Sequence, residues 1–394
     1  MTTTRRQFLI DGLRVSAAVS LASSLGLAAR RGRTGERVLV VLQLSGGNDG
    51  LNTVVPFHQD DYFRLRPTIS LAKGGLHRLD DEHGLHPELG GLGELFSEGR
   101  VAVVHGVGYP NPDRSHFRSM EIWHTGDPEH PAGDVGWMGR LSDEIVGDRP
   151  GSLAALHVGS GDLPLALWAR DAFAPSVVGD DAFRLEGEER FLVRREALLA
   201  GGSGGDELAF LRSAARTTYD AARRMERAAE RDTALEYPGY GLARRLRLVA
   251  KLVTGGFDTR LFHLELGGFD THARQAPAHA DLLRELSASL TAFQRDLEAA
   301  GVADRVVTLV FSEFGRRAQE NGSRGTDHGV GAPVLLVGSP VRGGLFGTPP
   351  DVTHLVDGDV PSTTDFRSIY GLLERNWLGL TPSSALAPPD LLRS

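Results

Sequence analysis

Residues 305–329 read RVVTLVFSEFGRRAQENGSRGTDHG. The stretch opens with a nearly continuous apolar run, Val306–Phe311, which is typical of a strand covered on both faces of a sheet. The run stops at Ser312-Glu313, so a carboxylate lies where a strand ends and a loop begins. Open α/β sheets place their ligands at that edge. We therefore take this strand end as the first candidate for a functional site.

A metal site is one interpretation of the loop that follows this strand. The loop contains Asp327 and His328. Together with Glu313, two carboxylates and an imidazole therefore come from one short segment. Glycines around them let the backbone approach a ligand closely. Hard and borderline divalent cations take this mixture of oxygen and nitrogen ligands. The alternative is a surface loop with ordinary polar residues, because short motifs also arise by chance.

The N-terminus carries a twin-arginine export motif. Arg5 and Arg6 precede Gln7-Phe8-Leu9, and a weakly apolar stretch, Val15–Ala29, ends in small residues that offer a cleavage site. The stretch is too short and too rich in Ser and Ala for a stable membrane span. We expect residues 1–36 to be a signal peptide and linker that directs the chain through the twin-arginine machinery to the periplasm or beyond. The alternative is an ordinary amphipathic helix.

Composition limits the classes of function. The chain has 394 residues, enough for one large domain or two, and a formal charge of −8, which gives nucleic-acid binding no electrostatic support. Cysteine is absent, so no disulfide, thiolate metal site or cysteine nucleophile is possible. Any metal must be held by His, Asp, Glu, hydroxyl or backbone oxygen atoms. No segment after the signal peptide is apolar enough to predict a membrane span.

Strand and helix patterns alternate along the rest of the chain. This alternation predicts an α/β fold with a mostly parallel central sheet and helices on both faces. We expect a single domain over residues 37–394, with a helical insertion around 200–256, including a charged helix over Leu208–Arg231. The expected strands are Val38–Leu44, Val101–His105, Leu153–Val158, Leu163–Trp168, Arg260–Leu266, Val306–Phe311 and Pro333–Val337. The other expected helices are Pro87–Ser97, Phe117–Trp123, Tyr240–Val253, Pro277–Ala300 and Asp365–Trp377.

Two more apolar strands end in glycines followed by an acid. The first runs into SGGNDG, which contains Asp49, and another runs into GGFDTH, which contains Asp270 and His272. Asp270 and His272 are two residues apart, so an extended backbone puts both side chains on the same side. Polar turns explain each stretch equally well by itself. Three such strand ends in one α/β chain favour a metal-centred site.

A serine lies at the start of an expected helix. Ser115 and His116 precede Phe117, from which apolar residues recur at helical spacing. Serine at this position usually caps the helix by accepting a backbone hydrogen bond. The other interpretation is a nucleophile or an anion-binding hydroxyl, because a helix N-terminus favours negative charge. From position alone the cap is favoured.

Taken together, the motifs resemble a known family. The leader, SGGNDG, RSHF, GGFDTH, SEFGR and GTDHG occur in this order over nearly all of the mature chain. As a set they are similar to the Tat-exported domain-of-unknown-function family 1501, which resembles the alkaline phosphatase and sulfatase superfamily in fold. The resemblance implies an alkaline phosphatase-like domain, one or two divalent ions and a hydroxyl nucleophile at a helix start.

The resemblance assigns roles residue by residue. It implies that Ser115 is the nucleophile and that Glu313 stands where the superfamily commonly has an aspartate before a histidine. Phe314 occupies the place of that histidine, which puts a full two-zinc site in doubt and leaves one ion, or an oxygen-rich site for Mg²⁺, Mn²⁺ or Ca²⁺. The implied metal ligands are Asp49, Asp270, His272, Glu313, Asp327 and His328.

The sequence thus predicts an exported, metal-dependent hydrolase of phosphate or sulfate esters. A divalent ion (Zn, Mg, Mn or Ca) would activate the Ser115 hydroxyl and offset charge on the substrate. His116 or His272 would donate a proton, and the sequence does not choose between them. The expected partners are a small-molecule or polymer ester and the export machinery. A secreted binding protein with a degenerate, structural metal site is the alternative, and Phe314 is the observation that favours it.

Overall fold

The computed structural model describes residues 37–149, 152–178, 223, 226–228 and 232–393. The predicted signal peptide and nearly all of the charged helix expected over Leu208–Arg231 lie outside these ranges. In the part of the chain that is described, no helix combines the length and the apolar character needed to cross a membrane.

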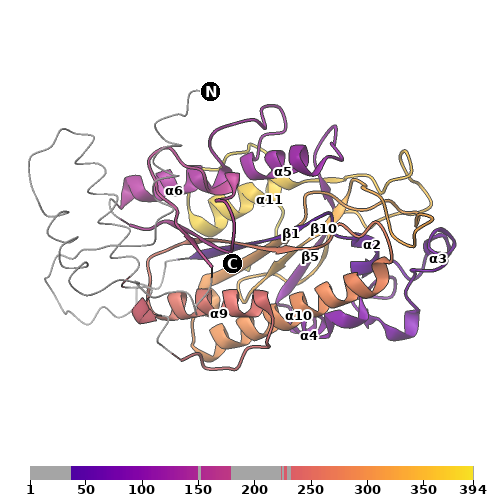
Figure 1. Cartoon of the computed structure of the whole chain (residues 1–394), viewed down its shortest axis with the longest axis horizontal. Helices are drawn as coiled ribbons and strands as arrows, with labels where there is room; N and C mark the ends of the chain where they lie inside the picture. The colour runs from indigo at the N-terminus through magenta and orange to yellow at the C-terminus, as the bar shows by residue number, and fades with distance from the viewer. Residues whose placement is uncertain (1–36, 150–151, 179–222, 224–225, 229–231, 394) are drawn as a thin grey trace, which may run out of the picture.

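A sheet of nine strands forms the centre of the described chain (Figure 1). Its order is β11-β5-β10-β9-β1-β8-β6-β7, and β12 pairs with β5. β10 runs antiparallel to its two neighbours, and the other pairings in this sheet are parallel. The predicted, mostly parallel sheet is therefore confirmed. The strands are β1 (Val38–Ser45), β5 (Val101–Gly108), β6 (Ala155–Val158), β7 (Ser176–Val177), β8 (Leu261–Gly267), β9 (Val306–Phe311), β10 (Ala332–Val337), β11 (Gly344–Phe346) and β12 (Thr364–Asp365).

Helices cover both faces of this sheet, as predicted. In Figure 1, α5, α6 and α11 lie on one side of the sheet, and α4, α9 and α10 lie on the other. A small second sheet, β2-β4-β3, lies outside the main one. The remaining bounds are α2 (Gly50–Thr53), β2 (Val54–Val55), α3 (Asp60–Leu65), β3 (His77–Arg78), β4 (Gly84–Leu85), α4 (Gly90–Ser97), α5 (His116–Thr125), α6 (Trp137–Asp148), α9 (Gly241–Thr254), α10 (Gln275–Ala299), α11 (Phe366–Gly371) and a π-helix (Leu372–Leu378).

Burial on both faces explains why the strands are almost wholly apolar. Successive side chains of a strand point to opposite faces. Along β1, Val40 and Leu42 therefore join the apolar cluster beneath α9 and α10, whereas Leu39 and Val41 join the cluster beneath α5, α6 and α11. Because neither face of the sheet is open to water, a polar residue in either alternating set would lose its hydration.

One expected strand is wrong. The segment Leu163–Trp168 contains a short 3-10 helix, Leu165–Leu167, instead of a strand. Pro164 precedes this helix and has no backbone N–H for a strand ladder. The indole Nε1 of Trp168 donates to the carbonyl of Leu163 at 3.0 Å, which closes the segment on itself. The apolar residues here fill a core position without joining the sheet.

The register of the sheet brings the three predicted strand ends to one edge. β1 pairs in parallel with β8, with Ser45 opposite Gly267, and in parallel with β9, with Gln43 opposite Phe311. The loops that carry Asp49, Asp270 and Glu313 therefore begin side by side. They pack closely, since a Cβ added at Gly46, whose φ is +119°, would lie 2.3 Å from the backbone nitrogen of Asp270.

Candidate metal site

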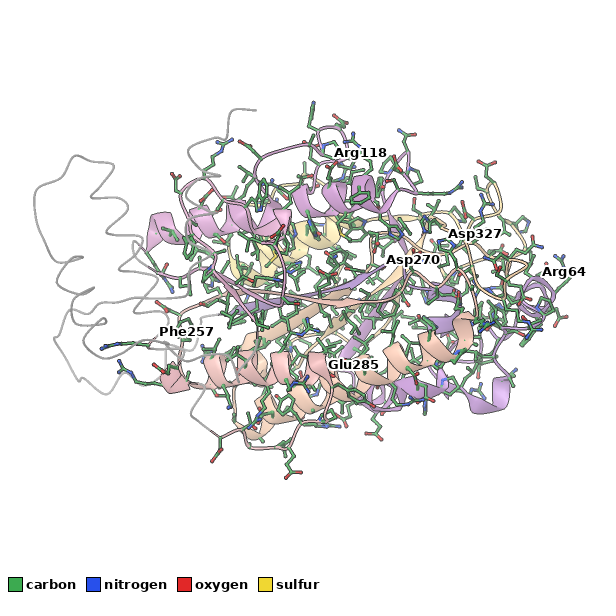
Figure 2. The ribbon with its side chains drawn as sticks, in the orientation of Figure 1. Arg64, Arg118, Phe257, Asp270, Glu285 and Asp327 are labelled. Carbon is green, nitrogen blue, oxygen red and sulfur yellow. The ribbon has the colours of Figure 1, made fainter. Side chains whose placement is uncertain are left out.

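Three imidazole nitrogens converge on one carboxylate oxygen at this edge of the sheet. Asp270 Oδ1 lies 3.0 Å from Nε2 of His272, 3.2 Å from Nε2 of His328 and 3.5 Å from Nε2 of His116. In the described residues, His116, Asp270 and His328 offer ligand atoms that all lie within 4.8 Å of one another. Figure 2 shows Asp270 and Asp327 near one end of the sheet. The segments that form this cluster come from three separate parts of the chain.

The other ring nitrogen of each histidine is held by an oxygen. Nδ1 of His116 lies 2.7 Å from Glu313 Oε1, and Nδ1 of His328 lies 2.7 Å from the carbonyl oxygen of Arg114. Nδ1 of His272 lies 3.2 Å from Asp327 Oδ1. Because these oxygens accept hydrogen bonds, they favour the tautomer with the proton on Nδ1. In that tautomer the lone pair of each Nε2 faces the centre of the cluster.

This arrangement fits a cation. Nε2 of His272 lies 2.9 Å from Nε2 of His328, so two lone pairs would face each other unless a proton or a metal ion lies with them. Nε2 of His116 is buried and has no hydrogen-bond partner in the described residues. Imidazole nitrogens together with a carboxylate are ligands that zinc and similar divalent ions take. The residues present therefore fit one divalent ion.

Arg316 binds Asp270 from the protein side, and sequence reasoning missed it. Its buried guanidinium donates to Asp270 Oδ1 at 2.7 Å and to the carbonyl oxygens of Gly46, Gly47, Phe269 and Thr326. Burial raises the pKa of Asp270, but the hydrogen bond and positive charge of Arg316 together with the neighbouring histidines outweigh it and lower that pKa to about 2. Asp270 is therefore anionic. The SEFGR motif contains this arginine, but arginines usually lie at the surface, so the residue type gave no signal.

Glu313 and Asp327 lie behind the histidines. Glu313 is buried, and it accepts from Nδ1 of His116, from the backbone nitrogen of Gly46 at 2.9 Å and from Ser312 Oγ at 3.0 Å. Burial raises the pKa of Glu313, and these hydrogen bonds lower it below the ordinary value. Asp327 Oδ1 accepts from Asn321 at 3.1 Å, which lowers its pKa, and from His272. These two predicted ligands thus do not face the centre of the cluster. Each is hydrogen-bonded to a histidine that does.

Asp49 does not join the cluster, although it follows a strand that ends at the same edge. Its Oδ2 accepts from Nη1 of Arg66 at 2.6 Å and from the side-chain amide of Gln275, and its Oδ1 accepts from the backbone of Asn52 at 3.4 Å. Burial raises the pKa of Asp49, but the charge and hydrogen bond of Arg66 lower it overall. Asp49 is thus an anion already paired with a cation of the protein.

Ser115 occupies the N-cap position of α5, but its hydroxyl does not cap the helix. The carboxylate of Asp113 accepts from the backbone nitrogen of Ser115 at 2.7 Å. Ser115 is exposed, and its neighbours in sequence both belong to the cluster, since the carbonyl of Arg114 holds His328 and the ring of His116 reaches Asp270. The capping interpretation, which position alone favoured, is therefore not realised in this geometry.

Phe314 packs beneath the histidines. The ring is buried, with its centroid 4.9 Å from that of His116 and 4.7 Å from that of His328. Phe314 offers no ligand atom. Its ring packs against both imidazoles and so restricts the positions that they can take.

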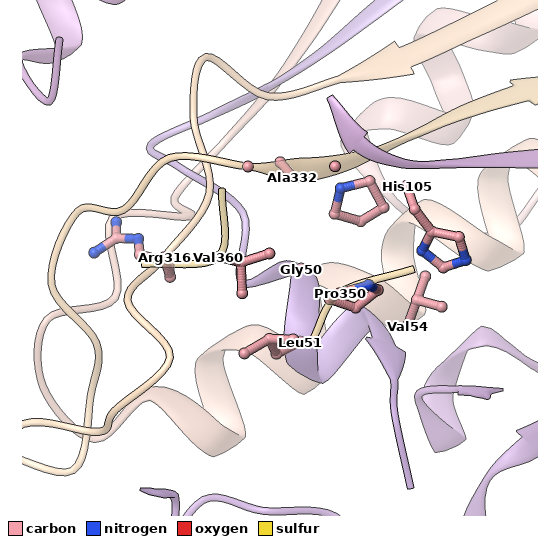
Figure 3. A pocket seen from close by; sticks show the side chains of 11 residues that line it. Gly50, Leu51, Val54, His105, Arg316, Ala332, Pro350 and Val360 are labelled. Atoms are coloured by element: carbon pink, nitrogen blue, oxygen red, sulfur yellow. The ribbon is translucent and has the colours of Figure 1, made fainter. Parts of the chain in front are cut away.

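A separate small pocket lies between β5, β10 and the 350–360 segment (Figure 3). Arg316 and His105 contribute to its lining, but none of the predicted site residues does. Nε2 of His105 is buried and lacks a hydrogen-bond partner among the described residues. The titratable groups gather at the cluster and not at this pocket, so the cluster is the candidate site.

Comparisons with known proteins agree with part of the sequence analysis. Residues 205–368 match the family described as "Protein of unknown function (DUF1501)". The resemblance that the motifs indicated is confirmed over this part of the chain, which holds Asp270, Glu313 and His328. No curated protein sequence matches the chain.

The solved structures to which this chain is similar have low sequence identity to it. One is the C-terminal periplasmic domain of EptC from Escherichia coli in complex with Zn, at a TM-score of 0.40 and 10% identity over 77% of this chain and 73% of that one. Another is the lipoteichoic acid synthase LtaP from Listeria monocytogenes, at 0.37 and 10% over 90% and 75%. A third is the PsFucS1 sulfatase from Pseudoalteromonas sp., at 0.39 and 13% over 90% and 69%. At these scores and identities the likeness says nothing about the chemistry of this chain.

Proposed function

We propose that this chain is a metal-dependent hydrolase of phosphate or sulfate esters, with its ion held by His116, Asp270 and His328. The observation that carries the proposal is the shared orientation of the histidines. Each Nδ1 is held by an oxygen of the protein, and each Nε2 is aimed at the carboxylate of Asp270. Metal-binding histidines characteristically have such an acceptor behind them. When bound, a divalent ion lowers the pKa of a nearby hydroxyl and offsets charge on a phosphoryl or sulfuryl oxygen.

Ser115 is the nucleophile in this proposal. Its hydroxyl is exposed and free of a capping role, and it lies at the positive end of the ten-residue helix α5. Ser115 Oγ attacks the phosphorus or sulfur atom of the ester and gives its proton to a base, the bond to the alcohol breaks, and the base returns the proton to the alcohol oxygen. Water then cleaves the ester formed on Ser115 and releases phosphate or sulfate.

His272 and Asp327 form the proton-transferring pair. Both side chains lie at the rim of the cluster, and Asp327 fixes the ring of His272 through Nδ1. With its Nδ1 proton held by Asp327, Nε2 of His272 carries a lone pair, and in this proposal it takes the proton of Ser115 and passes it to the leaving alcohol. In this assignment His116 binds the ion instead of donating a proton, while Glu313 and Asp327 orient histidines instead of binding the ion.

The proposal includes export. The support is the Arg5-Arg6 motif with its weakly apolar continuation, which predicts transport of the folded chain through the twin-arginine pathway. The protein would then act in the periplasm or outside the cell on a small-molecule or polymer ester. Fractionation of cells that express the Arg5→Lys/Arg6→Lys chain, compared with the unchanged chain, tests this part: loss of the exported form is expected.

Metal analysis combined with an ester screen tests the activity. We expect the purified protein to contain a divalent ion and to hydrolyse p-nitrophenyl phosphate or p-nitrophenyl sulfate, and a chelator should abolish turnover until the ion is returned. His328→Ala should lose both ion and turnover. His354→Ala, which removes an exposed histidine outside the cluster, should keep both. An unchanged metal content in His328→Ala would contradict the proposed site.

A binding protein with a structural ion is the second candidate. Phe314 favours it, because this ring fills the side of the cluster with carbon where the resemblance implies another imidazole. In that case the ion would raise the melting temperature, and no ester would be hydrolysed with or without it. A turnover that is lost in Ser115→Ala would exclude this candidate.

A further inference from the structure

We infer that the chain binds a single divalent ion and that the guanidinium of Arg66 supplies at Asp49 the positive charge that a second ion would bring. The inference rests on the metal site proposed above. It concerns how many ions that site holds, and it assigns Asp49 a positioning role in place of a ligand role.

The first observation is the hydrogen bonding of Arg66. Nη1 donates to Asp49 Oδ2 at 2.6 Å and to the side-chain oxygen of Asn52 at 2.8 Å. Nε donates to the carbonyl of Ala318 at 2.9 Å, and Nη2 donates to that of Arg317 at 3.0 Å. All three nitrogens therefore have acceptors. Arginine is charged at any ordinary pH, so this cation is always present beside Asp49.

The second observation is burial. The side chains of Asp49 and Arg66 are both 0% exposed. A metal ion that took Asp49 would have to displace a guanidinium with no route to water and leave it without a counter-charge. Breaking a buried pair in this way is strongly unfavourable, because the remaining charge loses both its partner and hydration. Asp49 is therefore closed to a second ion.

Asp49 serves the cluster from a distance. The side-chain nitrogen of Gln275 donates to Asp49, and the side-chain oxygen of Gln275 accepts from Thr326 Oγ1 at 2.6 Å. Thr326 directly precedes Asp327 and His328, and its carbonyl oxygen also accepts from Arg316 at 2.7 Å. The Asp49–Arg66 pair is thus the fixed end of a buried chain of hydrogen bonds that holds the loop carrying His328.

Counting ions tests the inference on the whole folded protein. The metal-free protein is titrated with Co²⁺, whose visible absorption reports coordination, and with Zn²⁺ followed by equilibrium dialysis and elemental analysis. We expect the titration curve to show one break, at one equivalent of metal ion per chain. A second tight equivalent would overturn the inference, whereas no binding at all would instead contradict the metal site on which it rests.

A variant separates a ligand from a positioning residue. Asp49→Asn/Arg66→Gln removes both charges and keeps hydrogen-bonding side chains in place. We expect this protein to bind one Co²⁺ with an unchanged absorption spectrum and an affinity within about tenfold of the original. His116→Ala should lose the ion and, with it, the Co²⁺ spectrum. An altered Co²⁺ spectrum in the double variant would mean that Asp49 is a ligand. If the double variant does not fold, the single break in the unchanged protein still decides the number of ions.

Discussion

Glu313 Oε1 accepts a hydrogen bond from Nδ1 of His116 at 2.7 Å, which joins the end of β9 to the first residue of α5. The same oxygen accepts from the backbone nitrogen of Gly46, at the end of β1. One buried carboxylate thus fixes the relative positions of two strand ends and a helix. It also raises the pKa of His116, first through this hydrogen bond, and so makes Nε2 a stronger metal ligand.

Glu313→Gln should weaken metal binding without removing it. Glutamine can still accept from Nδ1 of His116 but carries no charge, so the imidazole becomes less basic. We expect a roughly 10- to 100-fold loss of affinity for Zn²⁺, measured by competition with a chromophoric chelator. Glu121→Gln, at an exposed carboxylate of α5, is the matched control and should leave affinity unchanged. An effect of the same size in both variants would point to general electrostatics instead of the Glu313–His116 bond.

Arg316→Met should be among the most destabilising substitutions in the described chain. The variant takes the cationic partner away from Asp270 and leaves the carbonyl oxygens of Gly46, Gly47 and Thr326 without the donor described for them. We expect the free energy of unfolding of the metal-free protein to fall by about 3 kcal/mol or more, because each buried carbonyl oxygen left without a donor costs about 1–3 kcal/mol. Urea denaturation measures it. Arg324→Met, at an exposed arginine on the loop before Asp327, should change it by less than about 0.5 kcal/mol.

The fold was largely predictable because its signals are local. Val38–Leu44, Arg260–Leu266 and Val306–Phe311 are continuous apolar runs, and such runs form strands wherever both faces are covered. The parallel register then places the ends of these strands at one edge. Leu163–Trp168 is equally apolar, but it contains Pro164, which cannot donate a hydrogen bond to a neighbouring strand. Its apolar character alone therefore predicted the wrong element.

The roles of the individual residues in the site could not be predicted in the same way. Asp49 and Asp270 follow glycines at strand ends in similar sequences, yet each is paired with a different buried arginine, and the Asp49 pair is sealed from water. Arg66 lies 17 residues after Asp49 in the sequence, and no local sequence pattern predicts their contact. Partners of this kind are set by tertiary packing, so the ligand role of Asp49 could be judged only from the structure.

Acid should weaken the metal-free protein through Asp270. Its pKa is lowered to about 2 in the folded protein from an ordinary value of 3.8, so the anion stabilises the folded state above about pH 4. This stabilisation is lost as the pH falls from about 4 to about 2. Because Asp270 is 48% exposed, we expect the loss to be only about 1 kcal/mol. Urea unfolding of the original protein and of Asp270→Asn from pH 7 to pH 2 measures it, and the difference between them should shrink in that window. A constant difference would contradict the assignment.

Ser115→Ala separates catalysis from helix capping. The Ser115 hydroxyl makes no capping hydrogen bond, so its removal should change the free energy of unfolding by less than about 0.5 kcal/mol and leave the bound ion in place. Turnover of the ester should fall by at least about 1,000-fold if Oγ is the nucleophile. Asp113→Ala is the matched control, because the carboxylate of Asp113 does hold the backbone nitrogen of Ser115. That variant should cost about 1 kcal/mol of stability while retaining measurable turnover. The opposite pattern, with stability lost in Ser115→Ala and turnover kept, would return Ser115 to the role of a cap and move the nucleophile to water.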